Sequence, residues 1–226
     1  RKIIIILDEI QWIAKTGSGM IGSLKEAWLK WERSGLIKVI VCGSSNKFFS
    51  TNVGGEDEIL RGIATYGTLW IEPFSLSEVK EYYFPKWSLE EICLIYMMVG
   101  GVPYYLKQID AGMGFIHAVN EAVFTNKTIF IDEIEEILNL EFNISGKINA
   151  RNILSSMGQD GAAQDAIVRK TGLSQSTVSE LLSKLQDYKI VFTKYPIHLS
   201  PSRRGAGSKY YMKDFYLNFF FQVIEP

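Results

Sequence analysis

Ile3-Ile4-Ile5-Ile6-Leu7-Asp8-Glu9 is the stretch that decides the fold class of this chain. Five large aliphatic residues in succession are typical of a parallel β-strand that is buried on both faces. Two carboxylates follow at the carboxyl end of this predicted strand. In an open α/β sheet, that end of the strands borders the crevice in which ligands bind. The stretch therefore predicts a buried strand of a parallel sheet, with Asp8 and Glu9 at the edge of a binding crevice.

The segments that follow extend this prediction to a β-α-β unit. Residues 24–31 place apolar side chains at positions 24, 27, 28 and 31, which is the spacing of one helix face. A second apolar run, residues 39–42, ends in Gly43, Ser44 and Ser45. Parallel strands have their carboxyl ends at the same edge of a sheet. We therefore expect the two serines to face the same crevice as the two acids.

An apolar strand that ends in two acids is also the form of a Walker B motif. In a phosphate-hydrolysing site the first acid, Asp8, holds Mg²⁺ through water, and the second, Glu9, orients or deprotonates the attacking water. The alternative is an ordinary buried strand that ends in a helix-capping acid. A Walker B strand normally follows a phosphate-binding loop by many tens of residues, but only Arg1 and Lys2 precede this one. We therefore expect the chain to be a fragment that begins at Walker B.

Composition limits the remaining classes of function. The 226 residues contain two cysteines and two histidines without paired spacing, so the sequence predicts neither a zinc site nor a disulfide framework. It shows no signal peptide and no apolar run of about 18 residues, which predicts a cytoplasmic protein without a membrane partner. Residues 1–146 carry 13 Lys and Arg against 19 Asp and Glu, whereas residues 147–226 carry 11 against 6. This asymmetry predicts two modules, the second able to meet an anionic surface.

The middle of the chain is predicted to be largely helical. Residues 68–74 are expected to form a short strand that proline ends, and Ser75 and Glu78 form the capping box of a following helix. Helical patterns continue to Val99, after which Gly100-Gly101-Val102-Pro103 predicts a turn between helices.

Residues 147–226 have the pattern of a winged helix. A first helix has an apolar face, a second covers residues 164–171, and a glycine turn leads to a third helix that Ser174 caps. Strands at 190–196 and 209–212 would form the wing, and the aromatic end of the chain is expected to form a final helix that packs on those strands. The expected apolar positions of the first and third helices are Ile153, Leu154, Met157, Val178, Leu181, Leu182 and Leu185.

Four of these segments together, in their order and spacing, resemble a known family. Residues 7–12 (LDEIQW), 42–45 (CGSS), 71–78 (IEPFSLSE) and 100–106 (GGVPYYL) resemble the AAA-related, STAND-like P-loop ATPases of archaea and bacteria that carry a C-terminal winged helix. The resemblance implies an α/β plus α fold. Its parts are the C-terminal half of a P-loop ATPase sheet at 1–76, a helical lid at 77–146 and a winged-helix domain at 147–226.

The resemblance also implies roles for residues at the strand ends. Asp8 would be the Walker B ligand of Mg²⁺ and part of the nucleotide site, and Glu9 the catalytic base. Ser44 or Ser45 would be the sensor that hydrogen-bonds the γ-phosphate or the attacking water. Arg61 lies near the position where the family carries an arginine that neutralises charge on the transferred phosphoryl group. Ile63, however, stands where that arginine was expected.

Two further elements concern the nucleotide. Gly101 and Pro103 match the GxP element of the lid, in which proline presses on the nucleotide base. The sequence contains no phosphate-binding loop that ends in Gly-Lys-Ser/Thr. We therefore expect ATP and Mg²⁺ to be cofactors of a full-length parent only, and this chain to be inactive alone.

The C-terminal module could act on DNA or on protein. In the first case Gln175, Ser176 and Ser179 would enter the major groove, and Glu180 on the same helix would repel phosphate. In the second case the module would pack on its own ATPase domain as a regulator. The basic residues expected on phosphates are Arg203, Arg204 and Lys209.

The sequence thus predicts an ATP-dependent molecular switch whose nucleotide state is coupled to the winged helix. Its expected partners are ATP, then DNA, another protein or a further C-terminal domain. One alternative is a winged-helix DNA-binding regulator with a vestigial ATPase half. Another is an interaction module without enzymatic activity.

Overall fold

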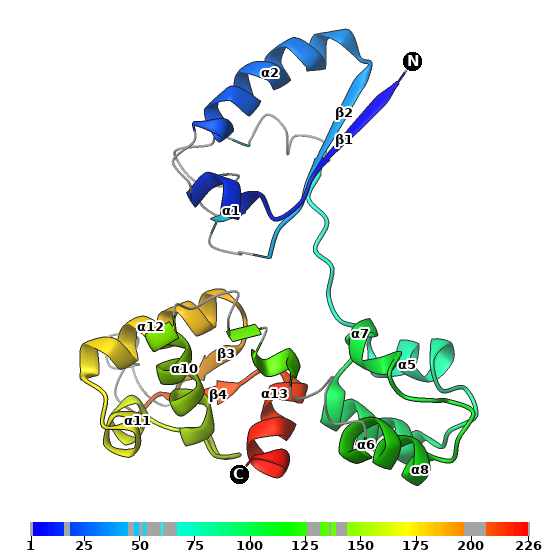
Figure 1. Ribbon diagram of the computed structural model, residues 1–226, viewed down its shortest axis with the longest axis vertical. Coiled ribbons are helices and arrows are strands. Elements are labelled where there is room, and N and C mark those ends of the chain that lie inside the picture. Colours follow the sequence, from blue (N-terminus) through cyan, green and yellow to red (C-terminus); the bar gives the residue numbers. More distant parts are fainter. Residues whose placement is uncertain are drawn as a thin grey trace. The chain divides into compact units, whose positions relative to one another are not determined.

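The computed structural model describes residues 2–15, 19–44, 48–49, 52, 60, 67–125, 132–135, 137–138, 144–196 and 207–225. The chain divides into two compact units, residues 1–71 and residues 72–226, each of which is described by itself (Figure 1). The elements of the first unit are β1 (Ile3–Leu7), α1 (Ile10–Lys15), α2 (Met20–Ser34) and β2 (Ile37–Val41).

The second unit is mainly helical. Its helices before residue 126 are α5 (Leu76–Tyr82), α6 (Leu89–Val99), α7 (Pro103–Leu106), α8 (Phe115–Val119) and the π-helical turn η1 (Asn120–Thr125). Its later elements are α10 (Ile144–Ser156), α11 (Gln164–Thr171), α12 (Gln175–Asp187), β3 (Val191–Lys194), β4 (Lys209–Met212), α13 (Phe215–Phe219) and the π-helical turn η3 (Phe220–Ile224).

In the first unit, the predicted β-α-β unit is present. Strands β1 and β2 pair in parallel, in a register that runs from Ile3 opposite Ile37 to Leu7 opposite Val41. Helix α2 packs on this sheet through a core to which its Leu24 and Trp28 belong. The spacing of apolar residues in 24–31 therefore predicted this helix correctly.

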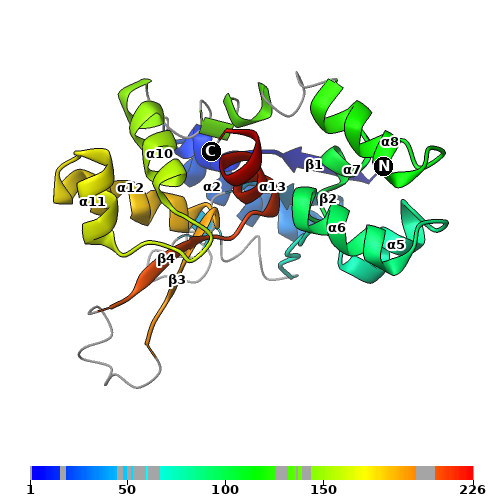
Figure 2. The ribbon, with the colours of Figure 1, turned by 90° about the horizontal axis from the view of Figure 1, so that it is seen from below.

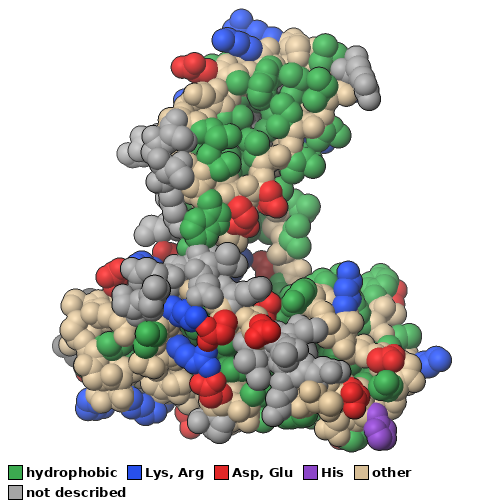
Figure 3. Space-filling model, in the orientation of Figure 1, with side chains coloured by type: hydrophobic (Ala, Val, Ile, Leu, Met, Phe, Trp, Pro, Cys, Tyr) green, Lys and Arg blue, Asp and Glu red, His purple; other side chains and the backbone are tan. Residues whose placement is uncertain are grey.

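The expectation that the first strand is buried on both faces is wrong for the described part of the chain. Ile4 and Ile6 alternate with the inward-facing Ile5 and Leu7, and each is 63% exposed. The reason is that α2 and its neighbours cover only the face on which Ile5 and Leu7 lie. Hydrophobic side chains accordingly gather on the surface of this unit in the space-filling view (Figure 3).

The predicted strand at residues 68–74 is also wrong. This segment has no strand pairing with any described residue, and Leu69 and Ile71 are 85% and 89% exposed. At its end, the N–H of Phe74 donates to the carbonyl of Gly101 over 2.8 Å, and the carbonyl of Phe74 accepts the hydroxyl of Tyr96 over 3.0 Å. The β-propensity of the segment is not matched by a neighbouring strand, and a strand exists only as part of a ladder.

Two capping boxes start the helices α5 and α6. Ser75 accepts a hydrogen bond from the backbone of Glu78, whose carboxylate accepts one from the backbone of Ser75, as predicted. Ser88 and Glu91 form the same reciprocal pair at the start of α6. Each box satisfies backbone donors that have no partner within the helix.

The C-terminal module follows the predicted order of elements. Helix α11 has the predicted bounds, Gly172 ends it with φ at +70°, and the hydroxyl of Ser174 caps α12. Strands β3 and β4 form an antiparallel hairpin that extends from the helices (Figure 2). The positions predicted for the core of this module are all buried: Ile153, Leu154, Met157, Val178, Leu181, Leu182 and Leu185.

The final helical segment packs differently from the prediction. It was expected on the strands of the wing, and α13 does touch β4, but its main partner is α6. The rings of Phe215 and Tyr96 meet edge to face with centroids 5.3 Å apart, and those of Tyr216 and Tyr105 lie 4.7 Å apart. One hydrophobic core consequently runs from α5 to η3.

Among the described residues, the structure contains no helix that combines the length and apolar character needed to span a membrane.

Candidate active site

The carboxyl ends of β1 and β2 come together in the first unit. Beyond the last pair of the ladder, the N–H of Cys42 donates to the carbonyl of Leu7 over 2.8 Å, and the N–H of Ile10 donates to the carbonyl of Cys42 over 3.1 Å. These two bonds hold the turn after β1 against the turn after β2. The hydroxyl of Ser44 is thereby placed 3.0 Å from Oε2 of Glu9, to which it donates.

Glu9 has an unusual backbone conformation. Its φ of +47° lies in the left-handed region, which few residues other than glycine adopt. The turn carries the chain from the end of β1 to the start of α1 within two residues, and Oδ1 of Asp8 accepts the N–H of Glu9 over 3.0 Å. Backbone strain of this kind is concentrated at functional sites. Among the described residues other than glycine, Lys189 after α12 is the other one with a positive φ, at +58°.

A third polar side chain, Gln11, joins this pair of strand ends. Its amide nitrogen donates to Oε2 of Glu9 and, over 3.0 Å, to the hydroxyl of Ser44. Gln11 is only 2% exposed although it is polar. The sequence placed Gln11 next to the two acids but gave it no role, because its burial depends on how the strand ends meet.

The carboxylate oxygens at the strand ends are of the kind that bind a magnesium ion together with a nucleotide. Asp8 is exposed and offers one carboxylate at the strand end. No group of three or more His, Cys, Asp or Glu side chains that could enclose a metal occurs among the described residues. Mg²⁺ is commonly bound by one or two carboxylates together with waters and substrate phosphates rather than by an all-protein cage. The arrangement suits that mode of binding.

The two lid residues of the prediction lie in the second unit. Gly101 is buried against the segment that precedes α5, and Pro103 is exposed in the first turn of α7. Proline is favourable there because its missing N–H has no partner in a first helical turn. Pro103 is thus accessible to a ligand, whereas the position of Gly101 is explained by packing.

The residues predicted to meet DNA are exposed where the structure describes them. Gln175, Ser176 and Ser179 lie on the outer side of α12, where Glu180 and Lys184 form an ion pair. The ammonium group of Lys209 donates to the carbonyl of Asp160 over 3.3 Å. Four predicted site residues lie outside the described residues: Ser45, Arg61, Arg203 and Arg204.

Comparison with known proteins adds evidence on the fold. No family model matches the chain. An uncharacterised protein of Methanocaldococcus jannaschii is 25% identical to it over 223 residues, which are 99% of this chain and 49% of that protein. The chain thus spans about half the length of this relative.

Two solved structures are similar to the chain. The Walker-type ATPase of Pyrococcus abyssi matches 97% of this chain and 63% of its own, with a TM-score of 0.62 and 16% identity. The ORC1 protein of Aeropyrum pernix, solved in complex with DNA, matches 95% and 62% with a TM-score of 0.41 and 17% identity. The similarity to the first structure shows that the chain has a fold related to that of P-loop ATPases, which confirms this part of the prediction.

Proposed function

We propose that the chain is the Walker B, sensor and lid portion of an ATP-binding and ATP-hydrolysing molecular switch of the STAND-like class. The observation that carries this proposal is the hydrogen bond between the Ser44 hydroxyl and the Glu9 carboxylate. It joins the ends of two parallel strands at the edge of the sheet where α/β proteins bind ligands. The fold, which is related to that of P-loop ATPases, supports it.

Each polar group at the strand ends then has a chemical role. Bound Mg²⁺ supplies charge neutralisation for the transferred phosphoryl group. Asp8 would hold that ion through water, and Glu9 would take the proton of the attacking water. The hydroxyl of Ser44 donates a hydrogen bond to Glu9 in this structure. The same hydroxyl can turn and donate to a phosphate oxygen instead.

The second unit supports the coupling that a switch requires. Residues 72–226 form one compact unit in which α13 packs on α6, so the helices that carry Pro103 share a core with the C-terminal helix-turn-helix. In this proposal the helices from α5 to η1 form the lid, and the elements from α10 onward form a winged helix. A movement of the lid on nucleotide binding would carry the C-terminal module with it.

The first test uses the chain by itself. The sequence has no Gly-Lys-Ser/Thr loop to cradle the phosphates. Calorimetry with millimolar Mg-ATP should therefore show no binding in the micromolar range and no hydrolysis. Micromolar affinity would mean that the nucleotide site lies elsewhere in this chain.

The second test uses a full-length protein that contains both this chain and a phosphate-binding loop. Glu9→Gln should leave ATP binding intact and lower kcat about 100-fold or more, the scale of losing a general base. Asp8→Ala should instead weaken binding of Mg-ATP. Unchanged turnover in Glu9→Gln would exclude Glu9 as the base.

A DNA-binding regulator is the second candidate. It is favoured by the helix-turn-helix geometry of α11 and α12, which leaves Gln175, Ser176 and Ser179 exposed on one helix. Against it, Lys184 on that helix is already paired with Glu180. A mobility-shift assay at low salt distinguishes the two, because non-specific binding to phosphate is strongest there.

A further inference from the structure

Gln11 is placed where it touches both groups that the proposed function assigns to the water and the phosphate. Its two amide hydrogens have two acceptors, Oε2 of Glu9 and the hydroxyl of Ser44, and that hydroxyl donates to the same Oε2. Three side chains therefore close a ring of hydrogen bonds. Oε1 of Glu9 accepts no hydrogen bond from any described residue, so it is the oxygen available to a water molecule.

The side-chain amide of Gln11 lowers the stability of the fold. Its Oε1 is buried and has no hydrogen-bond partner among the described residues. A buried acceptor without a partner destabilises the folded state, and an apolar side chain of the same size would avoid that loss. Stability therefore does not explain a glutamine at this position, whereas hydrogen bonds to Glu9 and Ser44 do.

Gly43 leaves room for this amide. A Cβ at position 43 would lie 2.1 Å from Oε1 of Gln11 and 2.9 Å from Cε2 of Phe49. Any larger residue would push the amide out of its position. The strand end that delivers Ser44 therefore also provides the slot that holds Gln11.

We propose that Gln11 is a positioning residue for Glu9, and that the glycine at position 43 keeps its amide in place. The proposal rests on the proposed function, since it assigns Gln11 to the base of that reaction. Gln11 fixes the carboxylate of Glu9 beside Ser44 and directs its other oxygen toward the attacking water. Misplacement of a catalytic group by about 1 Å can cost about 100-fold in rate.

The decisive variant is Gln11→Met in the full-length ATPase, because methionine has a similar size and no amide. We expect kcat to fall 10- to 100-fold, the Kd for ATP to change less than about twofold, and Tm to stay equal or rise. Gly43→Ala should lower kcat in the same way by displacing the amide. Gly22→Ala is the matched control, because a Cβ there meets nothing within 4 Å.

A readout without nucleotide comes from the 226-residue chain alone. The side-chain amide protons of Gln11 should exchange slowly with solvent and should shift in NMR spectra of Glu9→Gln and Ser44→Ala. Fast exchange in the wild-type chain would overturn the proposal.

The kinetic outcomes separate the two proposals. If Glu9→Gln lowers kcat but Gln11→Met and Gly43→Ala do not, the role of Gln11 is wrong and the proposed function stands. A loss of ATP binding and of Tm in Gln11→Met would show a merely structural role. If Glu9→Gln leaves kcat unchanged, the proposed function fails and the role of Gln11 fails with it. If Gln11→Met does not fold, the result for Gly43→Ala decides.

Discussion

The backbones of Gly101 and Phe74 lie directly against each other. The N–H of Phe74 donates to the carbonyl of Gly101 over 2.8 Å, and a Cβ at position 101 would come within 1.8 Å of the carbonyl oxygen of Phe74. That oxygen also accepts the hydroxyl of Tyr96 over 3.0 Å, so it is held from a second side. The segment before α5 is thus fixed to the turn between α6 and α7, and only glycine fits at this point.

Gly101→Ala should therefore destabilise the second unit. Because the added methyl group would meet backbone rather than a flexible side chain, we expect a loss of about 3 kcal/mol or more, at the upper end of overpacking effects. Denaturant unfolding of the 226-residue chain measures it. Gly158→Ala is the control, since a Cβ there meets nothing within 4 Å. Equal stability of the two variants would contradict the close approach of the two backbones.

Local signals in the sequence predicted where helices of the second unit begin. Ser75 and Glu78 are three residues apart, and a capping box needs no partner from elsewhere in the chain, so its prediction is confirmed. The packing of segments that lie far apart in the chain could not be predicted from the sequence. The strand predicted at 68–74 has no strand partner among the described residues, and the helix α13 packs on α6 rather than mainly on the hairpin.

In the candidate site, too, the local features could be predicted from the sequence and the contacts between distant residues could not. A carboxylate pair after an apolar run is visible in the sequence, so Asp8 and Glu9 could be found from it. The hydrogen bond of Gln11 with Ser44 joins residues that are 33 positions apart. It depends on the register of β1 and β2, which the sequence pattern does not specify.

Tyr105 and Tyr216 should make the chain sensitive to alkaline pH. Burial, and then the carboxylates of Asp214 and Glu133, raise the pKa of Tyr105, and burial followed by the same two carboxylates raises the pKa of Tyr216. In the unfolded chain a tyrosine ionises near pH 10. A group with a raised pKa in the folded state stabilises the fold below its unfolded pKa, and this contribution is lost as pH rises.

We therefore expect the free energy of unfolding to fall above about pH 10. In Tyr105→Phe it should fall less steeply, because about one proton fewer is released per molecule when the chain unfolds. Urea unfolding between about pH 9 and 11.5 measures both slopes. Tyr82→Phe, on a ring that is largely exposed, is the control and should keep the wild-type slope. The same slope in Tyr105→Phe as in wild type would refute the assignment.

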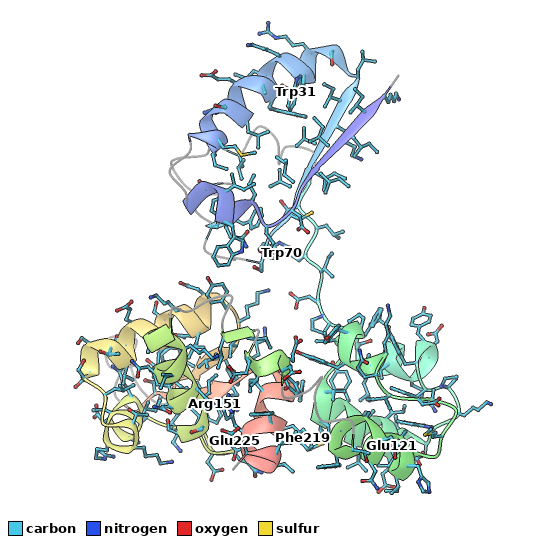
Figure 4. All side chains as sticks on the ribbon, in the orientation of Figure 1. Trp31, Trp70, Glu121, Arg151, Phe219 and Glu225 are labelled. Atoms are coloured by element: carbon cyan, nitrogen blue, oxygen red, sulfur yellow. The ribbon has the colours of Figure 1, made fainter. Side chains whose placement is uncertain are left out.

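Arg151 on α10 holds the end of the chain. Its guanidinium binds both carboxylate oxygens of Glu225 (Figure 4). It also donates to Oε1 of Glu135 over 2.9 Å. It also lies over the rings of Phe220 and Phe221, 5.7 and 6.0 Å from their centroids. A planar guanidinium that is bonded at two oxygens and covers aromatic rings has a fixed geometry.

Arg151→Met should loosen η3 and lower the free energy of unfolding by about 1 kcal/mol, at the upper end for partly exposed ion pairs. Carboxypeptidase should then remove the C-terminal residues faster. Lys184→Met is the control, because it breaks only the exposed pair with Glu180 within α12, for which we expect a much smaller loss of stability and no change in C-terminal cleavage. Equal cleavage of Arg151→Met and wild type would rule out this anchoring.

The last prediction concerns the alternative in which the C-terminal module binds DNA. Arg203 and Arg204 would then contribute charge to phosphates without reading bases, so replacing both with alanine should weaken binding equally on all duplex sequences. The slope of log K against log salt should flatten by about 0.9 for each phosphate that is no longer neutralised. Gln175→Ala should instead change sequence preference, because base edges are read from the recognition helix in the major groove. If the wild-type module binds no duplex at low salt, the nucleic-acid role fails, and its packing on α6 through α13 supports the regulator instead.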